Sequence, residues 1–111
     1  MASDVSFVEY VRDQIGRAGD VSFRKMFGEY AIYCDGKVVA LVCDNQFFLK
    51  PTAAGRAFLG NVIEASPYQG AKPHFLIEEE LEDQDFASEL VRLTKGELPV
   101  PKPRKPRRQR P

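Results

Sequence analysis

The chain has 111 residues, 43% of them hydrophobic, which is typical of a single globular domain. No apolar run approaches the roughly 18 to 20 residues that a membrane-spanning helix needs. The charged N-terminal segment also lacks the pattern of a secretory signal peptide. We therefore expect a cytoplasmic protein that does not associate with membranes.

The net charge of zero hides an uneven distribution along the chain. Residues 1–100 hold all 16 acidic residues and ten of the 16 basic ones, a net charge of −6. Residues 101–111 hold the other six basic residues and no acid, a net charge of +6. This asymmetry predicts a folded domain, residues 1–98, followed by a disordered Pro-rich basic tail, residues 99–111.

The first half of the predicted domain begins with a helix at residues 4–18, where apolar residues recur at 3.6-residue spacing. Four segments of strand composition follow, separated by turn residues: 21–27, 29–34, 37–43 and 46–50. Gly28, between the first two strands, is expected to form a bend or a bulge. Thr52 is expected to cap a short helix at residues 53–59.

The Asp35-Gly36 pair predicts a β-hairpin, because a type I′ turn needs positive φ at both central residues. A side chain at Gly36 should therefore be costly, whereas Asn should replace Asp35 with little effect. A strict two-residue loop would pair Ile32 with Val39, which makes both faces of the hairpin apolar. Such a hairpin predicts a sheet that is covered on both sides or contacts a partner subunit.

The same register places Cys34 and Cys43 on one face with Ile32 and Leu41, as small buried hydrophobic residues. Cys43 would lie opposite Gly28, six residues along the strand from Cys34, or roughly 20 Å. That separation exceeds the ~7 Å limit between bridged Cα atoms, so two free thiols are expected. A redox switch is the alternative.

The second half of the domain is predicted to contain a further strand at residues 74–78 and an amphipathic helix at residues 82–95. Phe86, Leu90 and Leu93 should form the buried face of that helix. A meander of strands flanked by helices indicates an α+β fold. The expected architecture is an antiparallel β-sheet, with the DG hairpin and a further strand, packed with N-terminal and C-terminal helices.

Few residues have the chemistry of a catalytic, metal or cofactor site, and we predict no enzyme activity and no cofactor. His74 is the single histidine and begins an apolar strand, so we favour a half-buried histidine over a general base. No glycine-rich phosphate-binding motif and no metal-ligand spacing occurs. The acidic run at residues 78–85 is interpreted as a solvated helix start, with cation binding as the alternative. The loop at residues 66–73 is interpreted as a connection, with Tyr68 and Lys72 lining a ligand groove as the alternative.

Two cations of the first strand, Arg24 and Lys25, are explained least by folding. Adjacent strand residues point to opposite faces, so these two cannot form one patch by themselves. We expect one of them to face solvent or an acid, where it could contact a phosphate or a protein partner.

The tail carries the clearest functional signal that depends on composition alone. Its prolines exclude helix, and it has no apolar surface to bury. Six cations in such a segment predict weak, sequence-independent nucleic-acid binding. They are Lys102, Arg104, Lys105, Arg107, Arg108 and Arg110. The alternatives are a solubilising tail and a tail that folds back on the acidic domain.

Two long stretches, SFRKMFGEYAIYCDGKVVALVCDNQFFLKP (22–51) and GAKPHFLIEEELEDQDFASELVRLT (70–94), resemble the TfoX N-terminal domain family of Sxy-type competence regulators. The resemblance covers roughly residues 5–95. It implies an α+β domain with an antiparallel sheet, and a bacterial role in switching on DNA-uptake genes alongside another transcription factor. Better-known members carry a second, C-terminal domain, so this chain is expected to be a stand-alone copy.

These observations predict a small non-enzymatic regulatory or adaptor protein that acts through a protein partner, such as a transcription factor. A homodimer is one form that it could take. The first alternative is a nucleic-acid-binding accessory protein that uses the basic tail. The second is a small-molecule-binding domain with a site in a groove of the sheet.

Overall fold

The computed structural model describes residues 3–26 and 28–98. The basic tail predicted at residues 99–111, with its six cations, lies outside the described residues. The elements in chain order are α1 (Val5–Gln14), the 3₁₀ turn η1 (Gly16–Ala18), β1 (Val21–Met26), β2 (Glu29–Cys34), β3 (Lys37–Cys43), β4 (Gln46–Leu49), α2 (Ala53–Leu59), β5 (Glu64–Ala65), β6 (His74–Ile77), the 3₁₀ turn η2 (Glu79–Glu82) and α3 (Gln84–Glu97). None of the described helices has the length and apolar character needed to cross a bilayer.

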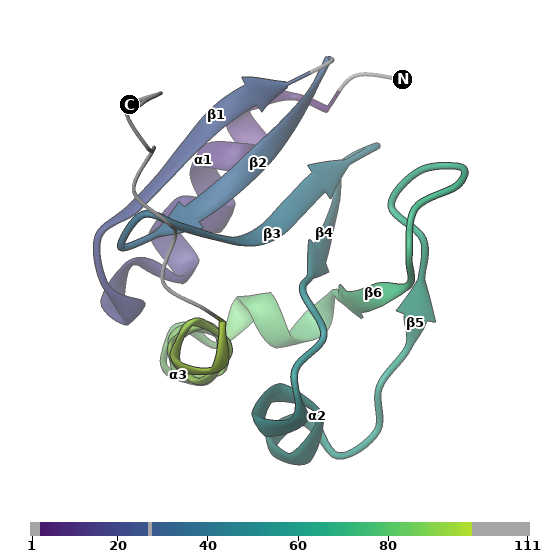
Figure 1. Ribbon diagram of the computed structural model, residues 1–111. Helices are drawn as coiled ribbons and strands as arrows, with labels where there is room; N and C mark the ends of the chain where they lie inside the picture. Colours follow the sequence, from purple (N-terminus) through teal and green to yellow (C-terminus); the bar gives the residue numbers. More distant parts are fainter. Residues whose placement is uncertain (1–2, 27, 99–111) are drawn as a thin grey trace, which may run out of the picture.

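The strands form one antiparallel sheet in the order β1-β2-β3-β4-β6-β5 (Figure 1). The predicted α+β fold, with its meander of four strands and a further strand, is confirmed. The sequence did not predict β5, which is only two residues long and pairs with the start of β6. A two-residue strand is too short to show any alternation of apolar and polar residues.

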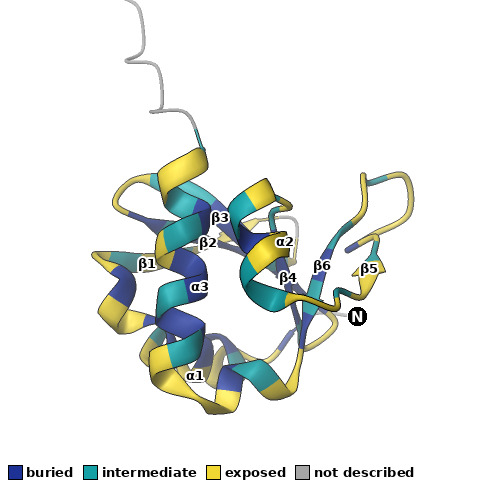
Figure 2. Ribbon diagram, turned by 90° about the horizontal axis from the view of Figure 1, so that it is seen from below, coloured by how far each residue is buried: buried dark blue, intermediate teal, exposed yellow. Residues whose placement is uncertain are grey.

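One hydrophobic core lies between a single face of the sheet and the helices. Buried residues of α1 (Val8, Val11) and α3 (Leu90, Val91) meet in it. The sheet contributes a contiguous apolar surface from the residues that face the helices. These residues include Ile32, Val42, Phe47, Leu49, Phe75 and Ile77. Seen from the helix side, α2 and α3 lie in front of the strands (Figure 2). Within the described residues, all helices therefore cover the same face. Of the two predicted arrangements, cover on both faces is not present among these residues, and contact with a partner subunit stays a prediction.

The hairpin register differs from the predicted one because β3 contains a bulge. Tyr33 pairs with Val38, as expected for a two-residue loop, but Ile32 pairs with Ala40 rather than with Val39. The extra residue buries both Val39 and Ala40 in succession. A bulge also increases the local twist, which suits a sheet that curves around α1 and α3. Every position of β3 beyond the bulge therefore faces the side opposite to the one that the sequence predicted.

The bulge also separates the two cysteines. Cys34 lies in the core with Ile32, whereas Cys43 shares the opposite face with Leu41. The prediction that both cysteines lie on one face was therefore wrong. The prediction that both are buried is confirmed, with exposed fractions of 0% for Cys34 and 6% for Cys43. Both are free.

The turn and the last helix agree with the sequence in outline and differ in detail. Asp35 and Gly36 have φ values of 52° and 84°, which confirms a turn with positive φ at both positions. In α3, Leu90 is buried as predicted, but Phe86 and Leu93 are only half-buried. The core positions are instead Ala87, Leu90, Val91 and Thr94. The ring of Phe86 stacks on Phe58 of α2, with centroids 4.6 Å apart.

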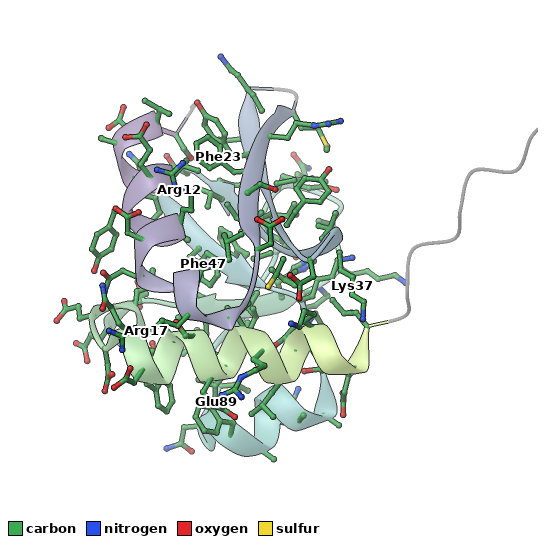
Figure 3. The ribbon with its side chains drawn as sticks, turned by 90° about the vertical axis from the view of Figure 1, so that its left-hand side faces the viewer. Arg12, Arg17, Phe23, Lys37, Phe47 and Glu89 are labelled. Carbon is green, nitrogen blue, oxygen red and sulfur yellow. The ribbon has the colours of Figure 1, made fainter. Side chains whose placement is uncertain are left out.

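The end of α3 is fixed to the hairpin. Lys37 Nζ donates hydrogen bonds to the carbonyls of Lys95 (3.0 Å) and Leu98 (2.9 Å) at the C-terminal end of α3, and Leu98 N also donates to Lys95 O (3.2 Å). Lys95 Nζ in turn donates to Asp35 Oδ2 (2.6 Å) and to Ala18 O (3.2 Å). Figure 3 shows Lys37 directed at this last turn of α3. These bonds fix the C-terminal end of α3 to the β2–β3 hairpin and to η1.

Candidate functional site

The face of the sheet opposite the helices, called here the outer face, carries an apolar row across four strands. Ala31, Leu41, Phe48 and Leu76 are successive cross-strand partners on β2, β3, β4 and β6. In most antiparallel sheets, the residues on a face that contacts only water are polar. In this row Ala31 and Phe48 are buried, with exposed fractions of 1% and 3%, and Leu41 and Leu76 are half-buried.

A groove of about 640 Å³ opens along this face, called here the outer groove. Most of its wall is apolar: Met26, Tyr30, Ala31, Leu41, Pro67 and Tyr68. Glu29, Cys43 and Asp44 complete it at the end where β2 and β3 meet the N-terminal segment. Two large side chains of the wall are open to solvent, since Met26 is 39% and Tyr68 is 61% exposed.

The loop between β5 and β6 forms the far wall of the outer groove. Pro67 is buried against the sheet, and Tyr68 follows it at the rim. A tight turn holds the loop in place: Ala71 N donates to Tyr68 O (3.0 Å), and Ser66 Oγ donates to Ala71 O (2.9 Å). The sequence offered this loop as a groove wall only as the alternative, and the structure places Tyr68 there. Lys72 is exposed but does not line the groove.

The acid in the wall, Glu29, is occupied by bonds within the protein. Its Oε1 accepts hydrogen bonds from Ser3 N (3.0 Å) and Ser3 Oγ (2.6 Å), and its Oε2 accepts one from Asp44 N (3.1 Å). Ser3 Oγ also accepts from Asn45 N (2.9 Å). The carboxylate therefore ties the N-terminal segment to the β3–β4 turn, and this end of the groove is built by a polar network that is already satisfied.

The thiol in the wall, Cys43, has a raised pKa. Burial raises the pKa of Cys43 to about 11, and the nearby charges of Glu29 and Asp44 act in the same direction. Burial also raises the pKa of Cys34. Since the thiolate is the nucleophile and metal ligand, Cys43 acts here as an apolar part of the wall.

The two cations predicted as partner or phosphate contacts lie on opposite faces of β1. Arg24 pairs with Ala31, so it stands on the outer face at the end of the apolar row. Lys25 pairs with Tyr30 on the other face. Both side chains are exposed, and neither forms an ion pair among the described residues. Of the two, only Arg24 stands on the face of the outer groove, where its strand partner Ala31 lines the groove.

The other chemically interesting residues do not converge on a site. His74 is half-buried, and its Nδ1 lies 2.9 Å from Lys72 O. Within residues 3–26 and 28–98, no group of three or more His, Cys, Asp or Glu side chains could hold a metal ion. The acidic run forms η2 and the start of α3, where Asp83 Oδ1 accepts from Phe86 N (3.1 Å) as a helix cap.

Sequence reasoning missed Met26 and the lack of a described helix over the outer face. Met26 is the last residue of β1, in the sequence RKMFG, and its composition alone indicates an ordinary strand residue. The available signal was the apolar character of both faces of the hairpin. Two apolar faces are compatible with helices on both sides of the sheet and also with one side that no helix covers. The pattern of the strands alone does not distinguish these two arrangements.

Comparison with known proteins identifies relatives of this chain. A family model described as the TfoX N-terminal domain matches residues 13–97. The chain is also 44% identical over 111 residues to a protein of Spirochaeta aurantia. The alignment covers 100% of this chain and 96% of the relative. That relative is named as an uncharacterized 12.7 kDa protein in the trpE 5′ region. The family match includes every residue that lines the outer groove.

Proposed function

Because the chain belongs to the TfoX N-terminal domain family, we propose that it is a non-enzymatic regulatory or adaptor protein that binds a segment of a protein partner in the outer groove. The observation that carries the proposal is an apolar groove of about 640 Å³ on a sheet face that no described helix covers. In keeping with the family resemblance, the proposed partner is a transcription factor of a bacterial competence-type system.

The composition of the groove supports binding of a protein segment. Exposed Tyr and Met side chains are enriched at protein interfaces, and Arg is enriched there too. Tyr68 supplies a rigid aromatic surface, and Met26 supplies an adaptable one. Arg24 stands at the end of the apolar row, as the strand partner of Ala31, and could pair with an acid of the partner.

The polar groups of the groove support binding rather than catalysis. Glu29 accepts three hydrogen bonds from the protein itself, so it is poorly placed to take a proton from a substrate. Cys43, with a pKa of about 11, is almost entirely protonated at pH 7. Neither residue therefore supplies an activated base or nucleophile.

Photo-crosslinking in the native cell tests the proposal. A photoreactive phenylalanine analogue replaces Tyr68 in one sample and Tyr10 in another, since Tyr10 is a second exposed tyrosine and lies outside the outer groove. Crosslinks to one protein from position 68, absent from position 10, would support the proposal. Equal crosslinking from both positions, or none from position 68, would contradict it.

Affinity measurements with the crosslinked partner complete the test. Truncation of an aromatic residue at the centre of an interface often costs more than 1.4 kcal/mol, so Tyr68→Ala should weaken binding about tenfold or more. Tyr10→Ala is the matched control and should change the dissociation constant by less than about twofold. A small molecule retained in the groove of the purified protein would favour the small-molecule alternative instead, because the volume also suits such ligands.

The second candidate function is nucleic-acid binding through the basic tail. The observation in its favour is the segregation of charge, with +6 in residues 101–111 and −6 in the rest of the chain. This candidate uses different residues from the outer groove, so the two functions can be tested separately.

A further inference from the structure

A second, smaller groove lies between α1 and η2, on another part of the surface. Its volume is about 340 Å³. The wall is built by aromatic and aliphatic side chains of α1, β4, β6 and η2: Phe7, Tyr10, Phe47, Ile77 and Leu81. Three acids, Glu78, Glu79 and Glu82, form its rim. We call this the α1/η2 groove, and nothing in the proposed partner-binding function uses it.

The aromatic wall is partly open to solvent. The rings of Phe7 and Tyr10 lie 6.2 Å apart at an angle of 34°, and Tyr10 is 39% exposed. Grooves lined by aromatic rings are the sites that bind Pro-rich segments, because a polyproline II helix presents rigid rings at low entropic cost. The wall therefore fits the ring of a proline.

The rim has an unmatched negative charge. None of Glu78, Glu79 and Glu82 forms an ion pair with any described residue. Of the nearby cations, Arg17 pairs with Asp85, and Arg12 lies over the ring of Phe23 at 5.4 Å. The described part of the chain therefore leaves the rim open to cations from elsewhere.

The C-terminal segment has the complementary pattern. A polyproline II helix has three residues per turn, so residues three apart share a face. Pro103 and Pro106 then fall on one face, and the six cations fall on the other two. The second face carries Arg104, Arg107 and Arg110, and the third carries Lys102, Lys105 and Arg108. One segment thus offers prolines to an aromatic wall and cations to an acidic rim.

The length of the chain beyond Leu98 is sufficient to reach the groove. η2 lies directly before α3, so the groove is near the start of that helix. The 14 residues of α3 carry the chain about 21 Å away from it, at 1.5 Å per residue. The 13 residues from 99 to 111 span about 40 Å in polyproline II form. The second half of the segment can therefore return to the groove of the same molecule.

We propose that the α1/η2 groove binds residues 106–110 of the same chain, with Pro106 on the ring of Tyr10 and the arginines at Glu78, Glu79 and Glu82. In this arrangement the acidic rim competes with any polyanion for the cations of the tail. The contact is intramolecular and electrostatic in part, so high salt should weaken it.

Paramagnetic relaxation measurements on the full-length chain test this inference. A nitroxide is attached through Gln109→Cys, and buried Cys34 and Cys43 remain unlabelled under mild conditions because burial raises their pKa values. Amide signals of residues 7–10 and 78–82 should broaden strongly, and those of residues 66–71 should not. The broadening should fall several-fold in 1 M NaCl, where the Debye length is only about 3 Å.

Two matched pairs of variants make the test specific. Tyr10→Ala should reduce the broadening several-fold, and Tyr68→Ala, in the outer groove, should leave it unchanged. Glu79→Lys should also reduce the broadening several-fold. Asp20→Lys, an equal change of charge at a residue that does not line the α1/η2 groove, should leave it unchanged. Broadening spread over all acidic surfaces, or insensitive to Tyr10→Ala, would overturn the proposal. So would equal broadening when spin-labelled chains are mixed with separate ¹⁵N-labelled ones, because the contact would then be between molecules.

Discussion

Asp35 is the residue whose role differs most from its sequence interpretation. The sequence predicts only a turn residue that Asn could replace. In the structure, Asp35 Oδ1 accepts from Asp20 N (2.8 Å), and Oδ2 accepts from Lys95 Nζ (2.6 Å). The hydrogen bond from Lys95, followed by the one from Asp20, holds the pKa of Asp35 below its ordinary value. The same bond raises the pKa of Lys95.

The stability of Asp35→Asn should therefore depend on pH. A depressed pKa means that Asp35 stabilises the fold above its unfolded pKa of about 4, and that this contribution is lost as the pH falls through the folded value. The raised pKa of Lys95 means that its contribution is present below about pH 10. We expect Asp35→Asn to lower the melting temperature at pH 7 and to approach the wild type near pH 2.

Asp44→Asn is the matched control for this change. Asp44 also has positive φ, at 54°, but its carboxylate accepts no hydrogen bond from a described residue. The control should therefore melt close to the wild type at both pH values. A difference between Asp35→Asn and the wild type that stays constant from pH 7 to pH 2 would show that the carboxylate charge is not involved.

Gly36 should be required for conformational reasons alone. A Cβ at this position would meet no atom within 4 Å, so only the φ of 84° opposes a side chain. We expect Gly36→Val to cost at least about 1 kcal/mol and to lower the melting temperature by several degrees. Gly16→Ala is the control, because Gly16 is equally open and lacks positive φ. Equal effects of both variants would mean that the turn conformation is not the cause.

The cysteines should react only after unfolding. Both are buried and free, and burial raises the pKa of each. The six residues of β3 that separate Cys43 from Lys37, the partner of Cys34, correspond to about 20 Å. We expect slow reaction with a thiol reagent at pH 8 in the native protein and two thiols per chain in denaturant. One oxidised pair within a chain would contradict the observed sheet.

At the scale of elements, α2 is held at its first turn by two side chains. Thr52 Oγ1 accepts from Gly55 N (3.0 Å), as the sequence predicts. Glu97, at the end of α3, accepts from Ala53 N (2.9 Å) and Ala54 N (3.2 Å). The second contact joins residues more than forty positions apart, so no local sequence signal could show it.

Loss of this contact should destabilise the protein measurably. Glu97→Ala leaves two amides at the start of α2 without their acceptor, and we expect a cost of about 1 kcal/mol in the free energy of unfolding. Glu97→Gln keeps one acceptor oxygen and should cost less. Urea unfolding of both variants measures the difference. If both variants had the same free energy of unfolding as the wild type, water would replace the carboxylate as acceptor at no cost.

At the scale of the whole molecule, the tail should bind duplex DNA weakly and without base recognition. Six cations can neutralise at most six phosphates, so the slope of log K against log salt should be no steeper than about −5. Replacing Arg107 and Arg108 by Ala should make the slope shallower by about 2. Anisotropy titrations of labelled duplexes at several salt concentrations measure both slopes. Salt-insensitive or sequence-selective binding would contradict this prediction.

The two grooves divide the molecule into surfaces with different character. The outer groove is apolar and lies within the residues that match the family, 13–97. The α1/η2 groove has an acidic rim, and Phe7 and Tyr10 of its wall precede the matched residues. The tail that we propose as its occupant follows them. The proposed partner contact therefore rests on the part shared with the family, and the proposed tail contact extends beyond it.

The sequence by itself determined the order of the helices and of the five longer strands, the DG turn, the cap at Thr52 and the α+β class. These features depend on contacts between near neighbours, and near neighbours leave local patterns in composition and spacing. Only the tertiary structure decided the bulge at Val39, the cover of the sheet by described helices on one face, and the placement of Tyr68 and Met26 in the wall of one groove. Each of these depends on how distant segments pack, and a one-residue shift in pairing reverses the faces of a strand without changing its sequence.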